Sequence, residues 1–409
     1  MLRDAAGRLG SFEVTTVGGE RVTAYVPQPL PPDPPLDLGR LLATYDRAVG
    51  AVGRLDGMAT ILPSTPLFLY MYVRKEALLS SQIEGTQSSL SDLLLFESDE
   101  IPHVAIDDVT EVSNYVAAVQ HGVARLHGGF PLSLRLIREM HDILLRSGRG
   151  ASMQPGEFRR SQNWIGGTRP GNALFVPPPP HRLMDCLDNF ERFLHSDEPA
   201  LPPLIRAGLA HVQFETIHPF LDGNGRLGRL LITLILCEAG ALSEPILYLS
   251  LFLKSRRADY YRLLQEVRFA GAWETWMEFF LTGVADTAEQ AARTARDLLA
   301  LFDADRRAIR ELGRPAASAL RVHEHLQERP IVTIQSASRA LGISIPTITS
   351  SLDHLTDLGI VRETTGRRRG RVFAYSNYLA IVDEGTEPLP AVTDAPRPSP
   401  PKPSFEAKK

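Results

Sequence analysis

The sequence has little cysteine, and neither of its two cysteines points to a structural bond. Cys186 and Cys237 both stand in apolar stretches of the 409-residue chain and lack the spacing of metal ligands. Disulfide pairing and zinc binding are therefore not expected to organise the fold. We interpret both residues as small buried hydrophobic side chains.

Long apolar runs and a large net charge are also missing. The most apolar run, LLITLILCEAGAL from Leu230, has about 13 residues, whereas a helix needs about 20 to span a bilayer. The first residues, MLRDAAGRLGSFEV, contain no apolar core of signal-peptide length. We therefore expect a cytoplasmic protein without membrane contact. A net charge of −4 argues against nucleic-acid binding over the whole surface but is compatible with a local basic patch.

What the sequence does contain is an extensive helical pattern. Hydrophobic residues make up 44% of the chain, enough for one large core or for two to three smaller ones. At least two helices are expected between residues 39 and 99, and further helices over 109–126, 132–145, 180–194, 203–217, 226–239, 258–268 and 273–312. Strand patterns are scarce before about residue 314. The sequence thus predicts a mainly α fold.

Other segments divide the chain into regions. Residues 14–26 alternate like a strand or hairpin, and the Pro-rich stretch PQPLPPDPPLDL after them is an extended arm. Gly-Gly and Pro-Gly pairs within 161–180 predict a hairpin with a mobile tip. From 315 to 381 the order is helix, short helix, helix and two strand-like stretches, VRETT and RVFAYSNY, around GRRRG. This order is typical of a winged helix-turn-helix. We expect an arm at 1–38, helical regions at 39–100 and 101–312, the winged helix at 315–382 and a disordered Pro-rich tail at 383–409.

One segment, HPFLDGNGRLGR from His218, has the composition of a polyphosphate-binding loop between two apolar helices. Pro219 disfavours helical geometry at His218, so the histidine is expected where the preceding helix ends. Gly223 and Gly225 permit positive φ and let backbone N–H groups approach an anion at the start of the next helix. The backbone of this loop therefore predicts a phosphate site.

Charged side chains of the same segment extend this prediction. Arg226 and Arg229 are three residues apart, so both can project from one helix face onto successive phosphates. Asp222 alone is too few ligands for a protein-only metal site, but one carboxylate with phosphate oxygens and water suits Mg²⁺. His218 can accept a proton from a hydroxyl near neutral pH. A lone Gly-Asn-Gly is usually a turn and a lone helix-end histidine usually a cap, but the combination favours phosphoryl or nucleotidyl transfer.

The segment resembles the Fic family signature, HPFx(D/E)GNGRxxR, at every defining position. In that family the loop binds ATP with Mg²⁺, and the histidine deprotonates a Ser, Thr or Tyr hydroxyl of a target protein. AMP is then transferred and pyrophosphate is released. The resemblance extends over about residues 38–312 and implies a Fic-type helical bundle with a flap β-hairpin and protein adenylyltransferase activity. Fic-fold kinases depart from the Gly-Asn-Gly-Arg pattern kept here, which disfavours transfer of the γ-phosphate.

The resemblance implies a role for each position of the loop. His218 would be the catalytic base, Asp222 the metal ligand, Asn224 an α-phosphate contact and Phe220 an anchor in the core. The implied ATP-binding residues are Gly223, Asn224, Gly225, Arg226, Leu227, Gly228 and Arg229.

Outside the loop, the resemblance implies two further sets of residues. The flap, which pins the target by main-chain pairing unless it is an ordinary surface hairpin, contains Trp164, Ile165, Gly166, Gly167 and Thr168. Tyr260 and Tyr261 resemble residues that line the adenine pocket, although core packing explains them almost as well. We predict structural roles for His211, Trp273 and Trp276.

A second motif, SSQIEG at Ser80–Gly85, resembles the family's inhibitory pattern (S/T)xxxE(G/N). Its glutamate, Glu84, would pair with Arg229 and occupy the guanidinium that orients the ATP γ-phosphate. The alternative is an exposed glutamate on a helix face. Some family members with this glutamate also remove AMP, and the sequence leaves that activity open.

The C-terminal region leaves two kinds of partner open. Arginines of the expected wing can contact DNA phosphates, namely Arg367, Arg368, Arg369 and Arg371. The expected recognition helix, about 345–358, contains Asp353 and Asp357 and no Lys or Arg. This composition favours protein docking or homodimerisation over DNA binding, which the fold alone does not decide.

Overall fold

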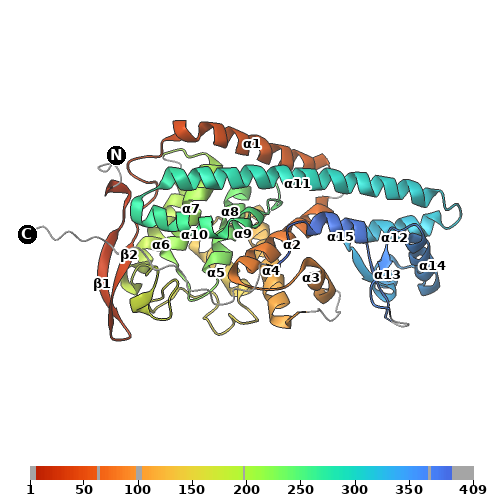
Figure 1. Ribbon diagram of the computed structural model, residues 1–409, viewed down its shortest axis with the longest axis horizontal. Helices are drawn as coiled ribbons and strands as arrows, with labels where there is room; N and C mark the ends of the chain where they lie inside the picture. Colours follow the sequence, from red (N-terminus) through yellow and green to blue (C-terminus); the bar gives the residue numbers. More distant parts are fainter. Residues whose placement is uncertain (1–5, 62–64, 98–103, 197–198, 367–369, 389–409) are drawn as a thin grey trace, which may run out of the picture.

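The computed structural model describes residues 6–61, 65–97, 104–196, 199–366 and 370–388 (Figure 1). After a short 3₁₀ turn, η1 (Ala6–Arg8), the strands β1 (Ser11–Val17) and β2 (Glu20–Val26) form an antiparallel hairpin. The Pro-rich stretch then continues without regular structure until α1 begins at Leu38. The predicted hairpin is confirmed, and the division of the chain into an arm and helical regions stays a prediction.

Helices form the body of the molecule, as the periodicity predicted. In chain order they are α1 (Leu38–Ile61), α2 (Thr65–Glu84), α3 (Leu90–Glu97), α4 (Ile106–His127), α5 (Leu134–Leu144), α6 (Pro180–His195), α7 (Pro203–Ile217), α8 (Asn224–Glu238), α9 (Ser250–Ser255), α10 (Arg257–Ala270) and α11 (Trp273–Arg310). The helices expected between residues 109 and 312 are all present, with ends that differ from the predicted ones by at most three residues. Local apolar spacing was sufficient to locate them.

Two adjacent helices hold the loop with the predicted chemistry. α7 and α8 pack against each other inside the helical body, where their apolar side chains join one large core. The loop between them is the segment that starts at His218. α1 and α11 lie side by side over this body, and α11 continues beyond it to the C-terminal region (Figure 1). None of the described helices is long and apolar enough to cross a membrane.

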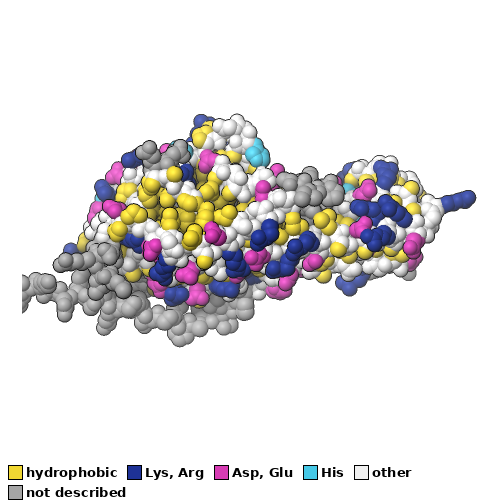
Figure 2. Space-filling model, turned by 90° about the horizontal axis from the view of Figure 1, so that it is seen from above, with side chains coloured by type: hydrophobic (Ala, Val, Ile, Leu, Met, Phe, Trp, Pro, Cys, Tyr) yellow, Lys and Arg dark blue, Asp and Glu magenta, His cyan; other side chains and the backbone are white. Residues whose placement is uncertain are grey.

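The outer face of α1 is unusually apolar for a helix at the surface. Leu38, Leu42 and Val49 are 44%, 57% and 43% exposed. Figure 2 looks onto the side of α1 and α11 and shows apolar side chains gathered over part of that face. A homodimer stays a prediction.

The C-terminal region has the expected helices and one more strand than expected. It consists of α12 (Ala316–Glu328), β3 (Ile331–Thr333), α13 (Ile334–Leu341), α14 (Ile345–Asp357), β4 (Arg362–Glu363), β5 (Val372–Ala374) and α15 (Ser376–Asp383). The strands form an antiparallel sheet in the order β3-β5-β4. This order suits a winged helix-turn-helix, which remains our interpretation. Arg367, Arg368 and Arg369 lie outside the described residues.

The end of this region differs from the sequence prediction. RVFAYSNY was expected to be one strand, but β5 ends at Ala374 and α15 begins at Ser376. The reason is that Tyr378 and Val382, four residues apart, are both buried on one face of a helix. The prediction of a disordered tail from residue 383 is wrong for its first residues, because residues 384–387 pack against α2 and α9 and Thr386 is 2% exposed.

Candidate active site

The loop begins where α7 ends in a left-handed residue. His218 has φ 49° and ψ 61°, and its N–H donates to the carbonyl of Phe214 at 2.9 Å. Pro219 disfavours helical geometry at His218, so the helix stops there, as the sequence predicted. Phe220 is fully buried and stacks on His141 with 3.7 Å between ring centroids. The aromatic pair anchors the loop in the core.

The side chain of Asn224 closes the loop. Its Oδ1 accepts from the N–H of Phe220 and its Nδ2 donates to the carbonyl of Phe220, both at 2.9 Å. The expected α-phosphate contact of Asn224 would therefore come from its backbone N–H, since the side chain is already bonded.

The start of α8 presents backbone donors. Gly223 has φ 78°, and the first bond within the helix runs from Leu227 N to the carbonyl of Gly223 at 3.0 Å. The N–H groups of Asn224, Gly225 and Arg226 precede that bond, so they point out of the helix end, where an anion binds favourably. The predicted phosphate site has a suitable backbone.

Leu227 and Gly228 support this geometry from below. Leu227 is fully buried in the core. A Cβ built on Gly228 would lie 2.6 Å from Oε1 of Glu215, so a side chain there would displace the Glu215 carboxyl where α8 packs on α7. Burial raises the pKa of Glu215 to about 7.

Arg229 is buried and bonded to the last turns of α2. Its Nε donates to Oγ of Ser80 at 2.9 Å, and its Nη2 donates to the carbonyl of Ser80 at 2.9 Å and to Oε1 of Glu84 at 2.7 Å. α2 ends at Glu84, and Gly85 follows with φ 110°. The motif residues that the sequence singled out thus meet Arg229.

Glu84 lies directly over the start of α8. A Cβ built on Gly225 would be 2.3 Å from Oε1 of Glu84. Burial acts to raise the pKa of Glu84, but the charge and hydrogen bond of Arg229 outweigh it and hold the pKa below its ordinary value. The ionised carboxylate therefore occupies the position where α8 would bind an anion.

The imidazole of His218 is held in its neutral form. Burial lowers the pKa of His218 to about 3, and the charges of Arg268 and Arg159 act in the same direction. Its Nδ1 is buried and has no hydrogen-bond partner among the described residues. A neutral ring at pH 7 can accept a proton.

Asp222 and Arg226 form the outer side of the loop. Oδ2 of Asp222 lies 3.6 Å from Arg226, whose Nη1 also donates to Glu111 at 3.1 Å. The side chain of Asp222 is 45% exposed. Within the described residues, no group of three His, Cys, Asp or Glu side chains could hold a metal alone. A single accessible carboxylate beside a phosphate site fits Mg²⁺ that shares phosphate oxygens and water.

Several residues that sequence reasoning missed hold the loop. Arg159 is buried and donates to the carbonyls of His218 at 3.0 Å and Pro178 at 2.6 Å. Asn163 donates to the carbonyl of His218 at 3.2 Å and to that of Phe220 at 2.9 Å. Arg159 precedes the predicted hairpin segment and Asn163 lies near its start, and neither carries a local motif, so only long-range packing reveals them.

His141 is another missed residue, and its contacts fix its tautomer. Nδ1 accepts from the N–H of Gly156 at 2.9 Å, so Nε2 carries the proton and donates to the carbonyl of Asp222 at 3.0 Å. Burial lowers the pKa of His141 to about 4. The neutral ring thus supports the loop through its hydrogen bond to Asp222.

The two tyrosines proposed for an adenine pocket differ in position. Tyr260 is buried and donates to Nε2 of His211 at 2.9 Å, while Nδ1 of His211 donates to the carbonyl of Gly228 at 3.0 Å. Tyr261 is 38% exposed, and the charge of Glu84 acts on its hydroxyl. Tyr261 is therefore the tyrosine accessible to a base. Trp273 and Trp276 are buried, as predicted.

The predicted flap forms a short hairpin. Its predicted residues are Trp164, Ile165, Gly166, Gly167 and Thr168. The N–H of Ile165 donates to the carbonyl of Phe175 at 2.9 Å, and a 3₁₀ turn, η2 (Pro170–Asn172), forms the tip. On the other side, the N–H of Tyr25 in β2 donates to the carbonyl of Val176 at 2.9 Å. The N-terminal hairpin therefore extends the flap; mobility of the tip stays a prediction.

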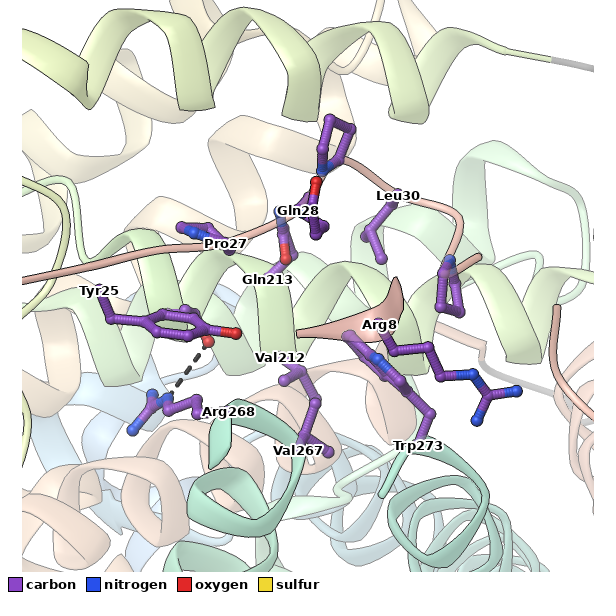
Figure 3. Close-up of a pocket in the computed structure, with 13 residues that line it drawn as sticks. Arg8, Tyr25, Pro27, Gln28, Leu30, Val212, Gln213, Val267, Arg268 and Trp273 are labelled. Carbon is purple, nitrogen blue, oxygen red and sulfur yellow. Dashed lines mark hydrogen bonds between the residues drawn. The ribbon is translucent and has the colours of Figure 1, made fainter. Parts of the chain in front are cut away.

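A small cavity lies beside the C-terminal part of α7 (Figure 3). Gln28 and Leu30 of the Pro-rich arm cover one side, and Val212, Arg268 and Trp273 line it from α7, α10 and α11. Its volume of about 20 Å³ has room for about one water molecule. The arm therefore covers the helices that support the site and leaves no space there for a nucleotide.

Comparison with protein families identifies both helical regions. A Fic/DOC family N-terminal model matches residues 42–124, and a Fic/DOC family model matches residues 131–236. The chain therefore contains a Fic/DOC N-terminal region and a Fic/DOC domain. The second match contains the loop and α8, and the first contains α2 with Glu84.

Individual relatives agree with this assignment. "Protein adenylyltransferase Fic" of Drosophila grimshawi is 32% identical over 197 residues, 46% of this chain and 38% of that protein. The protein of the same name in Drosophila melanogaster is 32% identical over 221 residues, 51% of this chain and 42% of that protein. The chain thus spans about two fifths of the length of the curated relatives it matches. A crystal structure of a Fic family protein from Desulfovibrio desulfuricans G20 has TM-score 0.52 at 20% identity and covers 81% of this chain and 95% of that one, which shows the shared fold.

Proposed function

We propose that this Fic protein is an adenylyltransferase that moves AMP from Mg·ATP to a Ser, Thr or Tyr hydroxyl of a protein, itself included. The observation that carries the proposal is the order of groups in one loop. Neutral His218 comes first, the start of α8 with its outward N–H groups follows, and Arg229 lies on that helix. The names of the matched relatives support the same activity.

The reaction follows from the positions of these residues. The start of α8, Arg226 and Arg229 bind the phosphates of ATP. Asp222 would hold Mg²⁺, which when bound neutralises phosphate charge. His218 accepts the proton of the target hydroxyl while the hydroxyl oxygen bonds to the α-phosphorus. The bond from that phosphorus to the oxygen bridging the α- and β-phosphates breaks, and pyrophosphate leaves with the electron pair.

The ATP itself improves the base. In the nucleotide-free protein burial and two arginines depress the pKa of His218. The negative charge of bound ATP raises that pKa, so the imidazole becomes a stronger proton acceptor when substrate is present.

We further propose that Glu84 inhibits this activity. Its carboxylate bonds to Arg229 and lies over Gly225, where the phosphates of ATP would otherwise bind. The γ-phosphate then cannot reach Arg229, and the α-phosphorus is not held in line with the hydroxyl. Displacement of Glu84 would switch the enzyme on.

Mass spectrometry of the Glu84→Gly variant after incubation with Mg·ATP tests the reaction. AMP adds about 329 Da to a hydroxyl and phosphate about 80 Da, as the composition of each group requires. A gain of the larger mass is expected, and a gain of only the smaller mass would show kinase activity instead.

Removal of AMP is a second candidate activity of the same site. The side chain of Glu84 is 36% exposed although it touches Arg229, so a water molecule can reach it beside the loop. Loss of AMP from a purified adenylylated protein on addition of wild type, but not of Glu84→Gly, tests this activity.

For the C-terminal region we propose protein docking rather than DNA binding. Arg371 of the expected wing lies 3.6 Å from Asp353 on α14, so an acidic side chain stands beside this arginine. Fewer cations then remain for DNA phosphates.

A further inference from the structure

Residues 384–387, directly after α15, lie along α2 and accept hydrogen bonds through their main chain. Nζ of Lys75 donates to the carbonyl of Glu384 at 2.8 Å. Nε2 of Gln82 donates to the carbonyl of Thr386 at 2.8 Å. Both donors belong to the helix that ends in Glu84. The segment is therefore bonded directly to the inhibitory helix.

α9 holds the segment from the other side. Nζ of Lys254 donates to the carbonyl of Gly385 at 3.2 Å and to that of Glu387. Gly385 has φ 79°, and a Cβ built there would lie 2.7 Å from Leu251. The segment thus occupies a groove between α2 and α9 that fits glycine at this position.

The donors of this groove are costly to leave without acceptors. Lys75 is 0% exposed, Gln82 1% and Lys254 6%. Burial lowers the pKa of Lys75 to about 8, although the charge of Glu384 acts in the opposite direction. If the segment left, the ammonium groups of Lys75 and Lys254 would lose these acceptors, whereas Nε2 of Gln82 would keep its bond to the carbonyl of Ser88 at 3.0 Å.

The contact joins the C-terminal region to the candidate active site. Gln82 is two residues from Glu84, and Ser80 on the same turn accepts from Arg229. α15, which ends at Asp383, packs against α2 and α11. A force that withdraws α15 would therefore pull the segment from the groove.

We propose that the groove between α2 and α9 is an intramolecular peptide-binding site, that its occupant is residues 384–387, and that this occupancy keeps Glu84 on Arg229. It recognises an extended segment by its successive carbonyls. A partner that binds the C-terminal region and moves α15 would empty the groove and release the inhibition. The inference rests on the proposed function of Glu84.

The test compares two glycine variants of the full-length chain. Gly385→Ala adds a methyl group against Leu251, whereas Gly342→Ala adds one at φ 63° with nothing within 4 Å. Both variants strain the backbone, and only the first also places a methyl group 2.7 Å from Cδ1 of Leu251, the movable end of that side chain, so we expect it to loosen the segment. Lys254→Met removes two of the hydrogen bonds without changing a glycine and is the second variant.

Two measurements are made on each variant: hydrogen exchange of residues 75–85, and AMP incorporated from Mg·ATP. Gly385→Ala and Lys254→Met should raise both by about fivefold or more, as expected for loss of about one buried hydrogen bond. Gly342→Ala should match wild type in both measurements. Adding Gly385→Ala to Glu84→Gly should not raise AMP incorporation further.

The outcomes separate the two proposals. The inference would be overturned if hydrogen exchange of residues 75–85 were the same in both groove variants as in wild type. It would also be overturned if their exchange rose and Glu84→Gly were active, but the groove variants incorporated no more AMP than wild type. If Glu84→Gly transfers no AMP, the proposed function fails, and hydrogen exchange alone decides whether the segment holds α2. Circular dichroism identifies a variant that has not folded, in which case the other groove variant decides.

Discussion

Oε1 of Glu84 lies 2.7 Å from Nη2 of Arg229, although 145 residues separate the two in the chain. This bond joins the last residue of α2 to the helix that follows the phosphate-binding loop. A charge-assisted hydrogen bond at such a distance is among the stronger contacts of a protein. An anion that competes for Arg229 has to displace Glu84 first.

Replacing Glu84 by glycine should activate the enzyme. Glu84→Gly frees Arg229 and the start of α8 for ATP, so AMP incorporation into the protein should rise by about tenfold or more, since loss of about 1.4 kcal/mol of competing interaction is tenfold. The measurement is incorporation of labelled AMP. Glu328→Gly, which changes the last residue of α12, is the control. Equal incorporation by wild type and Glu84→Gly would contradict the inhibitory role.

His218 should be essential for AMP transfer, and its protonation should cause the fall of the rate at low pH. Glu84→Gly/His218→Ala should lose activity, while Glu84→Gly should slow as the pH falls, because a protonated imidazole cannot accept a proton. The pKa of His218 is lowered to about 3 without nucleotide, and bound ATP raises it. The fall of kcat at low pH, which reports the ATP complex, should therefore occur at higher pH than the fall of kcat/KM, which reports the free enzyme. If both fell over the same pH range, the prediction would be contradicted.

The magnesium requirement should depend on Asp222. Asp222→Asn retains an oxygen for the N–H of Gly223, which Oδ1 accepts at 2.7 Å, but removes the negative charge. In the Glu84→Gly background it should raise the Mg²⁺ concentration needed for half-maximal AMP transfer by about tenfold or more. A Mg²⁺ titration with fixed ATP measures this, with Asp142→Asn as control. An unchanged requirement would exclude Asp222 as the ligand.

Buried His141 should make the fold sensitive to acid. Its pKa is about 4 in the folded protein and about 6.5 when unfolded. Between these values the unfolded chain binds the proton and the folded one does not, so stability falls as the pH falls from about 6.5 to about 4, by about 2 to 3 kcal/mol at the lower end. Urea unfolding at the upper and lower limits of this pH range should show that His141→Gln loses less free energy of unfolding than wild type. The exposed His127→Gln should lose as much as wild type.

The C-terminal region should bind duplex DNA weakly. Asp353 lies beside Arg371 and residues 345–358 contain no Lys or Arg, so any shift of a labelled duplex should need high protein concentration. A gel-shift series over rising salt measures this. Strong binding that weakens steeply with salt would instead establish a DNA-binding role, because phosphate contacts release counterions.

The sequence by itself determined the helices and the chemistry of the loop. Apolar spacing located α7 and α8, and Pro219 and Gly223 set the local backbone, because these effects act within a few residues. The same local reasoning failed at Ser376, where burial of Tyr378 favoured a helix, and at residue 383, where main-chain carbonyls found buried donors.

Only the tertiary structure decided how these parts act on one another. The resemblance of the SSQIEG motif implied that Glu84 pairs with Arg229, and the structure has that bond, whereas the support of His218 by Arg159 and the attachment of residues 384–387 to α2 had no signal in the sequence. Such contacts form when separate helices pack into one core, and no local pattern encodes which side chains then meet. Residue identities therefore decided what chemistry the loop can perform, whereas packing decided which distant side chains support it.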